Sequence, residues 1–336
     1  MFLKNFWYMI ACSHEVGRDL FSRIVLGEPV LLYRKLDGSV VGIADRCIHR
    51  QVPLSAGRLI GEQVQCGYHG LKYDDTGKCV RIPGQANIPA RACVKAYRVV
   101  EKDSIIWIWM GEPAQADLTA IPDHPMCSSP AYAGKMMCLS MDMHYQEGID
   151  NLLDLSHVDF LHPETVGSQD VAETVPEYKI EENAITVKRV MLDVLNTPLF
   201  KMVMGIDRVD RTQELQYWPI GNTRITTTTW PAGSINKGQP LTVYTITQFT
   251  PSTDKTTLVF VGMYRDFDVA NEKLSQAIID GVWKTVHEDK AVADHIRRNW
   301  DPDAPMIDLA VDRAPLAARS MLRRLYEQQQ QAAAAQ

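Results

Sequence analysis

The sequence predicts an α+β protein of two domains: an all-β domain first, then a domain in which helices wrap an antiparallel sheet. Three observations support this fold class. The chain has 336 residues, more than the roughly 250–300 that a single core usually supports. About the first hundred residues read as short strands between turns. The second half combines longer β-rich segments with two amphipathic helical segments near its end.

Turn signals separate the strands expected in the first domain. The clearest hairpin joins Pro29–Tyr33 to Val40–Ala44 through Asp37-Gly38. Tyr97–Val100 and Ile105–Met110 form another expected pair. Prolines without a clear period follow between residues 111 and 130, which is typical of a linker. We therefore expect domains at residues 1–120 and 121–336.

The second domain should begin with a helix and continue as a sheet. Gln146–Leu161 carries apolar residues at helical spacing. Five later segments are rich in β-branched and aromatic residues, as a pleated surface favours. They span residues 185–191, 214–218, 224–230, 241–249 and 257–264, and amphipathic helices are expected at 270–298 and 316–328. The Gln/Ala tail, residues 328–336, is expected to be disordered.

Composition excludes one class of partner and suggests a location. The formal charge is −6, with 46% hydrophobic and 23% charged residues, and nucleic-acid binding would need a basic face. No run approaches the roughly 20 apolar residues that cross a bilayer. The apolar stretch Phe6–Ala11 is shorter than most signal-peptide cores, so we expect an edge strand or core segment there and a cytoplasmic protein.

Two cysteine–histidine pairs form the strongest motif. Cys47 and His49 are separated by one residue, Cys66 and His69 by two, and sixteen residues lie between the pairs. With seven scattered cysteines the chain does not look like a disulfide framework. Two such loops can hold two irons, one on thiolates and one on imidazoles, with a potential of roughly −150 to +300 mV. Zinc accepts the same four ligands, although it more often uses other groupings.

This motif closely resembles that of the Rieske family, C-x-H-x₁₅₋₁₇-C-x-x-H. The chain departs from the family at Gly67, where Pro is usual, and at Leu71, where Trp is frequent. Neither residue is a ligand, so the departures bear on loop stiffness and potential. The extra cysteines of respiratory Rieske subunits are absent from both loops, and a Rieske ferredoxin would end near residue 110. The remaining residues therefore need another explanation.

A second set of polar residues lies at Asn151, Asp154, His157 and His162. On a helix the first three share one face, and the two imidazoles can occupy adjacent positions on one metal. Non-haem Fe(II) oxygenases use two His and one carboxylate and leave positions open for O₂. Alone, such residues on an amphipathic helix are as often a solvated face or a cap. The carboxylate candidates are Asp289, Glu288 and Asp294.

After a Rieske motif, the N-x-x-D-x-x-H-x₄-H pattern resembles Rieske non-haem iron oxygenases over nearly the whole chain. The group most similar to it comprises the oxygenase components of vanillate O-demethylase, dicamba monooxygenase and toluenesulfonate methyl-monooxygenase. They share the start Asn5-Phe6-Trp7-Tyr8 and the strand Trp107-Ile108-Trp109. The resemblance favours Asp289 as the third iron ligand and implies a catalytic domain of the helix-grip type.

The resemblance also implies a mechanism for degrading aromatic compounds. Electrons from NAD(P)H arrive through a separate flavin/iron–sulfur reductase, pass through the cluster and reach the mononuclear Fe(II) of a neighbouring subunit in a homotrimer. Asp154 would bridge a cluster His and an iron-ligand His, unless it only caps its own segment, and Asn151 would lie near the iron. Oxidation of a methyl or methoxy group is favoured. A ring dioxygenase, or a Rieske electron-transfer or ligand-binding protein without catalytic iron, remains the alternative.

The sequence leaves the substrate open. Apolar walls from the sheet and the first helix are expected to form the pocket, and our candidates are large side chains that are as readily explained as core. They are Phe160, Met202, Met204, Trp218 and Trp230.

Overall fold

The computed structural model describes residues 2–168, 170–235, 237–301 and 303–334. Its contacts divide the chain into two compact units. The first comprises Met1–Asp123 and Thr250–Lys255, and the second comprises His124–Phe249 and Thr256–Gln336. Of the helices in the described parts of the chain, none has both the length and the apolar character needed to cross a bilayer.

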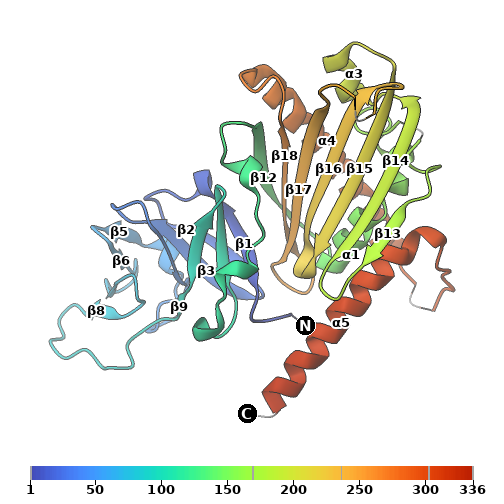
Figure 1. Cartoon of the computed structure of the whole chain (residues 1–336). Helices are drawn as coiled ribbons and strands as arrows, with labels where there is room; N and C mark the ends of the chain where they lie inside the picture. Colours follow the sequence, from blue (N-terminus) through green and yellow to red (C-terminus); the bar gives the residue numbers. More distant parts are fainter. Residues whose placement is uncertain (1, 169, 236, 302, 335–336) are drawn as a thin grey trace. The chain divides into compact units, whose positions relative to one another are not determined.

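The first unit is built from three small antiparallel sheets, with strand orders β1-β11-β10, β2-β3-β4-β9 and β5-β6-β7-β8 (Figure 1). The expected hairpin is present: β3 pairs with β4 in antiparallel register, and Gly38 in the turn between them adopts a φ of +87°. The strands are β1 Trp7–Cys12, β2 Phe21–Val25, β3 Glu28–Arg34, β4 Val40–Ala44, β5 Arg58–Ile60, β6 Gln63–Gln65, β7 Lys72–Tyr73, β8 Cys79–Arg81, β9 Ala96–Tyr97, β10 Val99–Lys102 and β11 Ile105–Trp109.

Short 3₁₀ turns punctuate this unit and the segment that follows it. They are η1 Ser13–Glu15, η2 Leu54–Ala56, η3 Pro113–Gln115, η4 Leu118–Ala120 and η5 Pro125–Cys127. The N-terminal strand β1 is fully buried and pairs with β11 at the edge of its sheet, as the apolar N-terminal sequence predicted.

The second unit contains one large antiparallel sheet of order β12-β18-β17-β16-β15-β14-β13, with helices against it (Figure 1). The strands are β12 Ala133–Met141, β13 Glu177–Ile180, β14 Ile185–Leu195, β15 Arg208–Trp218, β16 Asn222–Pro231, β17 Leu241–Pro251 and β18 Thr257–Arg265. The helices and 3₁₀ turns are α1 Tyr145–Leu153, η6 Leu155–His157, α2 Val158–Leu161, α3 Pro198–Met204, η7 Pro219–Gly221, α4 Glu272–Asn299, η8 Ala310–Asp312 and α5 Arg313–Ala334.

Helix α4 covers part of the sheet through one apolar stripe. Leu274, Ile278 and Val282 recur every four residues and pack against Val243 and Val261 of strands β17 and β18. This spacing keeps the side chains on one face of the helix. Asp289 follows Val282 by seven residues and lies on this same side of α4, so the helix is both a core element and a platform for a site.

Two expectations about helices need correction. The helix predicted over Gln146–Leu161 is broken at Asp154, whose backbone is extended (φ −109°, ψ 95°). The Asp154 carboxylate accepts the N–H of Ser156 and starts a new turn, which apolar spacing does not reveal. The tail expected to be disordered instead continues α5 through Ala334, because Gln and Ala are good helix formers. Residues 335–336 lie outside the described residues.

Candidate metal centres

The four Cys and His residues of the first motif lie on two loops with matching backbone bonds. In the loop after β4, the N–H of Cys47 donates to the carbonyl of Val52 at 2.9 Å. In the loop after β6, the N–H of Cys66 donates to the carbonyl of Leu71 at 2.8 Å. Both cysteines are buried, and both belong to the core of the β-strands around them. Each loop is therefore a closed turn that holds its thiol inside.

The two imidazoles of this motif face one another at the surface. Nδ1 of His49 and Nδ1 of His69 are 3.2 Å apart, and the two rings are exposed. Two nitrogens in that arrangement suit ligation of one metal ion, while two buried thiols suit a second. The donor set and its division between buried sulfur and exposed nitrogen fit a two-iron, two-sulfur cluster.

Hydrogen bonding around the thiols would act on such a cluster. The N–H of Ile48 donates to the Tyr73 hydroxyl oxygen at 3.3 Å, so the hydroxyl hydrogen is available to Sγ of Cys47 at 3.2 Å. Burial raises the pKa of the Cys66 thiol, whereas hydrogen bonds from the backbone N–H groups of Tyr68 and His69 act to lower it and are outweighed. Hydrogen bonds to cluster sulfurs help to set reduction potential. The sequence reasoning had no signal for Tyr73, which lies on β7 outside the motif.

Glycine is required where the two loops meet. A Cβ on Gly67 would lie 2.9 Å from the carbonyl oxygen of Ala56, and one on Gly57 would lie 2.0 Å from that of Gln65. The absence of a side chain at these positions allows backbone to approach backbone. This contact gives a physical reason for Gly67 in the second ligand loop.

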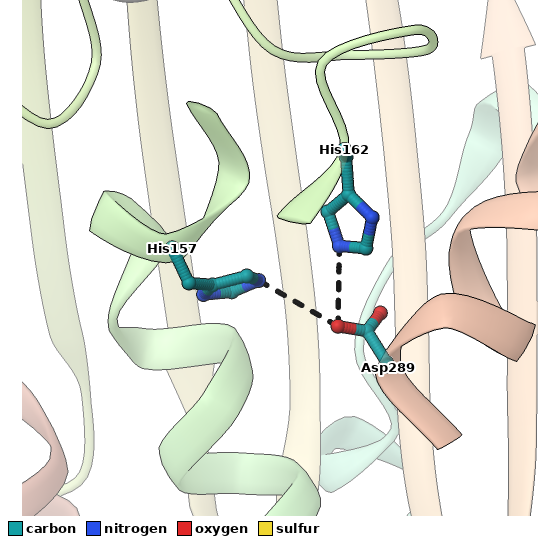
Figure 2. A group of neighbouring side chains, drawn as sticks. All are labelled: His157, His162 and Asp289. Carbon is teal, nitrogen blue, oxygen red and sulfur yellow. Dashed lines mark hydrogen bonds and ion pairs between the residues drawn. The ribbon is translucent and has the colours of Figure 1, made fainter. Parts of the chain in front are cut away.

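The second constellation converges although its residues come from separate segments. His157 ends η6, His162 follows α2, and Asp289 projects from α4, as Figure 2 shows. Oδ1 of Asp289 is 3.1 Å from Nε2 of His162 and 3.7 Å from Nε2 of His157. One donor atom from each residue lies within 4.8 Å of the others. Two imidazoles and one carboxylate so placed could hold a divalent iron ion on one face.

The outer nitrogens of both imidazoles are held by neighbours. Nδ1 of His157 donates to the backbone carbonyl of Asp154 at 2.6 Å, and Nδ1 of His162 lies 2.7 Å from Oε2 of Glu288. Each ring therefore directs Nε2 toward the centre, as metal-binding histidines require. Burial acts to lower the pKa of His162, but the hydrogen bonds and charges of Asp289 and Glu288 outweigh it and raise that pKa.

Each remaining candidate from the sequence has a defined place. Asn151 donates from Nδ2 to Oδ1 of Asp289 at 3.2 Å. Glu288, a rival third ligand, contacts the outer nitrogen of His162 instead. Asp294, the other rival, pairs with Lys290 and Arg297 on its own helix. The expected helical face shared by Asn151, Asp154 and His157 does not form, because the helix ends before Asp154.

A cavity of about 470 Å³ opens beside the second constellation, within the second unit. His157, His162 and Asp289 line it from the helical side, and side chains of β15–β18 line it from the sheet. This volume is in the range of small-molecule sites. Of the expected wall residues only Met202 is in the lining, and Phe160 is 79% exposed. Arg211, which is 2% exposed, also lies in the wall, and no sequence pattern indicated this.

Comparison with known proteins agrees with both regions. Residues 6–98 match the family model of the Rieske [2Fe-2S] domain, and residues 141–328 match that of the vanillate O-demethylase oxygenase C-terminal domain. The chain is 36% identical to the iron-sulfur subunit of the toluene-4-sulfonate monooxygenase system of Comamonas testosteroni, over 97% of both chains. It is 32% identical to the oxygenase component of dicamba O-demethylase of Stenotrophomonas maltophilia, over 88% of both.

Solved structures give the same result. Dicamba monooxygenase bound to 3,6-dichlorosalicylic acid superimposes with a TM-score of 0.92 at 28% identity, over 98% of each chain. The same enzyme with non-heme iron and dicamba gives a TM-score of 0.78, also at 28% identity and over 98% of each chain. The predicted fold class, an all-β domain followed by a sheet with helices, is confirmed by these likenesses.

Proposed function

The chain belongs to the family of Rieske oxygenases that includes the vanillate O-demethylase oxygenase subunits, and we propose that it hydroxylates or oxidatively demethylates a small, methoxybenzoate-like aromatic compound. It is the terminal oxygenase component of a Rieske monooxygenase system. Its cofactors are a [2Fe–2S] cluster and a mononuclear iron. What remains to be assigned are the residues, the partners and the substrate.

We assign the cluster to Cys47, His49, Cys66 and His69. The two buried thiols and the 3.2 Å approach of the two Nδ1 atoms support this assignment. One-electron transfer is the chemistry that such a cluster supplies. The loops around it exclude water from the sulfur side while leaving the imidazole side exposed.

We assign the mononuclear Fe(II) to His157, His162 and Asp289. The single observation that carries the proposal is the convergence of their donor atoms within 4.8 Å at the wall of the cavity. Iron held there supplies the activation of O₂. The protein residues orient this set: a backbone carbonyl and Glu288 fix the two rings, and Asn151 fixes the carboxylate. Substrate binding in the cavity places the carbon to be oxidised beside the open side of the centre.

The reaction consumes one O₂, two electrons and two protons per substrate. One oxygen atom enters a C–H bond of the substrate as a hydroxyl group, and the other leaves as water. On a methoxy group the product is a hemiacetal, which breaks its C–O bond to release formaldehyde and the phenol. We propose that NAD(P)H provides the electrons through a separate flavin/iron–sulfur reductase, since the relatives are components of multicomponent systems.

We further propose a cytoplasmic homotrimer in which residues 1–120 form the cluster domain and residues 121–336 the catalytic domain. In it Asp154 would link a cluster histidine of one subunit to His157 of its neighbour. The partly buried Asp154 side chain, one residue before η6 and next to the His157 turn, is in keeping with this role. NAD(P)H-fed electron supply favours a location in the cytoplasm.

Turnover with a matched reductase tests the proposed function. We expect NADH consumption coupled to formaldehyde release from at least one compound in a panel of methoxybenzoates, aryl sulfonates, phenoxy acids and N-methyl compounds. With ¹⁸O₂, one labelled atom should enter the product, and two would show ring dioxygenation instead. Holoprotein should contain about three irons per chain, two in the cluster and one in the second centre. A content of two, with no oxidised product from any compound, would contradict the proposal.

A further inference from the structure

The sheet wall of the cavity carries a group of buried polar atoms without partners. Nε of Arg211, Oε1 of Gln213 and Oγ1 of Thr229 are each buried, and none has a hydrogen-bond partner among the described residues. Leaving a buried polar atom unpaired costs roughly 1–3 kcal/mol. Such atoms are therefore rare in a finished fold, and several together point to a missing ligand.

The strand register places these atoms side by side. Arg211 and Gln213 alternate along β15 on the face that lines the cavity. Thr229 of β16 lies directly opposite Arg211, buried behind the cavity wall, and Thr227, which lines the cavity, lies opposite Gln213. The group thus occupies one continuous area of the sheet, across two neighbouring strands.

Arg211 has a charge that the surrounding protein only partly compensates. The side chain is 2% exposed, and its Nη2 bonds to the Ser168 hydroxyl. No carboxylate of the described residues forms an ion pair with it. Asp170 and Asp159 are near enough to influence it, but Oδ2 of Asp170 accepts the N–H of Leu195, and the two Asp159 oxygens accept the N–H groups of Ser168 and Ala172. A buried guanidinium without a paired anion is expensive to maintain.

Arg211 remains charged in this environment. Burial lowers the pKa of its guanidinium, but arginine is ordinarily so basic that the group stays protonated near neutral pH. A carboxylate or sulfonate has two or more oxygens that can accept a pair of parallel N–H hydrogen bonds from one guanidinium. Rotation of the Gln213 amide, which also lines the cavity, can present its N–H₂ to the same anion.

We propose that Arg211, with Gln213, binds the anionic group of an aromatic acid whose ring fills the cavity. This inference rests on the proposed function and assigns the residues that hold the charged end of its aromatic substrate. The metal-binding residues come from the helical wall and Arg211 from the sheet wall, with apolar residues of the strands and helices between. Arg211 thereby acts as a positioning and specificity residue, which fixes one end of the substrate while the other is oxidised.

Binding to the holoenzyme by titration calorimetry tests this inference with matched ligands. The probes are 3- and 4-methoxybenzoate and 4-methoxybenzenesulfonate, against the nearly isosteric, neutral 3- and 4-methoxybenzamides. We expect wild type to bind at least one anion roughly ten- to a hundred-fold more tightly than its amide, as a charge-assisted hydrogen bond implies. Anions that bind no better than the amides, including no detectable binding of either, would overturn the proposal.

Variants then locate the effect. Arg211→Gln should remove the preference for anions and change amide affinity less than about two-fold. Arg208→Gln is the matched control, because Arg208 is on the same strand, exposed and paired with Asp193. Unchanged anion binding in Arg211→Gln would refute the assignment. If that variant does not fold, Arg211→Lys should keep some preference with weaker anion binding, and Gln213→Leu should weaken the binding of anions more than that of amides. Wild-type affinity for the anions in both of these variants would equally refute the assignment.

Turnover in the same preparations separates this inference from the proposed function. Formaldehyde release from a neutral substrate by wild type, combined with no preference of wild type for anions in binding, would overturn the inference and keep the oxygenase. Anion binding that depends on Arg211 without oxidation of any compound would keep the binding site and overturn the proposed function.

Discussion

Asn151 donates a hydrogen bond of 3.2 Å to Oδ1 of Asp289, the same oxygen that both inner imidazole nitrogens approach. The bond joins α1 to α4, two helices far apart in the sequence. A carboxylate held by an amide cannot rotate freely about its last side-chain bond. We therefore expect Asn151 to orient Asp289 as the proposed iron ligand, since the neighbours of metal ligands commonly decide how well a metal is held.

We expect Asn151→Ala to lower iron affinity at the second centre by roughly 10–100-fold. The amide would no longer restrain Asp289, so the carboxylate would lose orientation before binding. Chelator competition, with iron content read after gel filtration, measures the change, and the visible absorption of the cluster should stay the same. Gln146→Ala is the control, because Gln146 makes a similar bond to Asp150 on the same helix. Equal iron retention in the two variants would contradict the prediction.

Glu288 is predicted to act through His162. Its Oε2 lies 2.7 Å from Nδ1 of the imidazole and so selects the tautomer whose Nε2 faces the centre. Glu288→Ala should weaken iron binding by roughly 10–100-fold, and Glu288→Gln, which keeps an acceptor, should weaken it less. Asp294→Asn serves as control, since Asp294 pairs only with Lys290 and Arg297 in the described ion-pair set. A loss in Asp294→Asn as large as in Glu288→Ala would rule out this role.

A substitution of Asp154 distinguishes two roles for this residue, a local cap and a link for electron transfer. Its carboxylate accepts the N–H of Ser156 at 2.9 Å, which an Asn side chain can also do. Asp154→Asn should therefore retain both iron sites and a thermal midpoint within a few degrees of wild type. It should nevertheless slow electron transfer from the reduced cluster to the second centre by about tenfold or more, the size of effect that substitutions beside metal ligands commonly have. Stopped-flow reoxidation of the cluster in the presence of substrate and O₂ measures it. A normal rate would leave Asp154 as a cap alone.

Strand patterns and the cluster motif could be read from the sequence because both are local. The hairpin around Gly38 and the β-branched and aromatic residues of β16 carry their information within a few positions. The break at Asp154 could not be read, since the apolar spacing of 146–161 continues through it and only the Ser156 contact reveals the new turn. Strand β12 was also not predicted: its apolar residues do not alternate, and pairing with β18 fixes it.

The choice between Glu288 and Asp289 shows why the site needed the fold. The two carboxylates are adjacent on α4, and both reach His162, one at Nδ1 and the other at Nε2. Spacing along a helix cannot separate these roles, because they depend on where α2 places the ring. Arg211 is a similar case. In a strand it reads as a solvated charge, and only the packing of the cavity buries it.

Asp210 gives a prediction for stability against pH. This β15 residue is 2% exposed, and its carboxylate accepts the N–H groups of Asp193 and Ile235 at 3.0 Å each. Burial acts to raise its pKa, but the backbone donors outweigh burial and hold the pKa below its ordinary value. A lowered pKa in the folded state means that the unfolded chain takes up the proton first as pH falls. The stabilisation is then complete above the unfolded value of about 3.9 and is lost as pH falls through the folded value.

We expect Asp210→Asn to reduce the free energy of unfolding by about 1–3 kcal/mol at neutral pH, because an amide N–H₂ would face backbone donors. Thermal midpoints of wild type and variant, measured from pH 7 down to 3, should differ by a constant amount above about pH 5 and should converge below about pH 4. Asp207→Asn is the control, since the Asp207 side chain is 70% exposed and pairs only with Lys201 among the described ion pairs. A gap between Asp210→Asn and wild type that persists unchanged to pH 3 would show that the charge of Asp210 is not what stabilises this corner of the sheet.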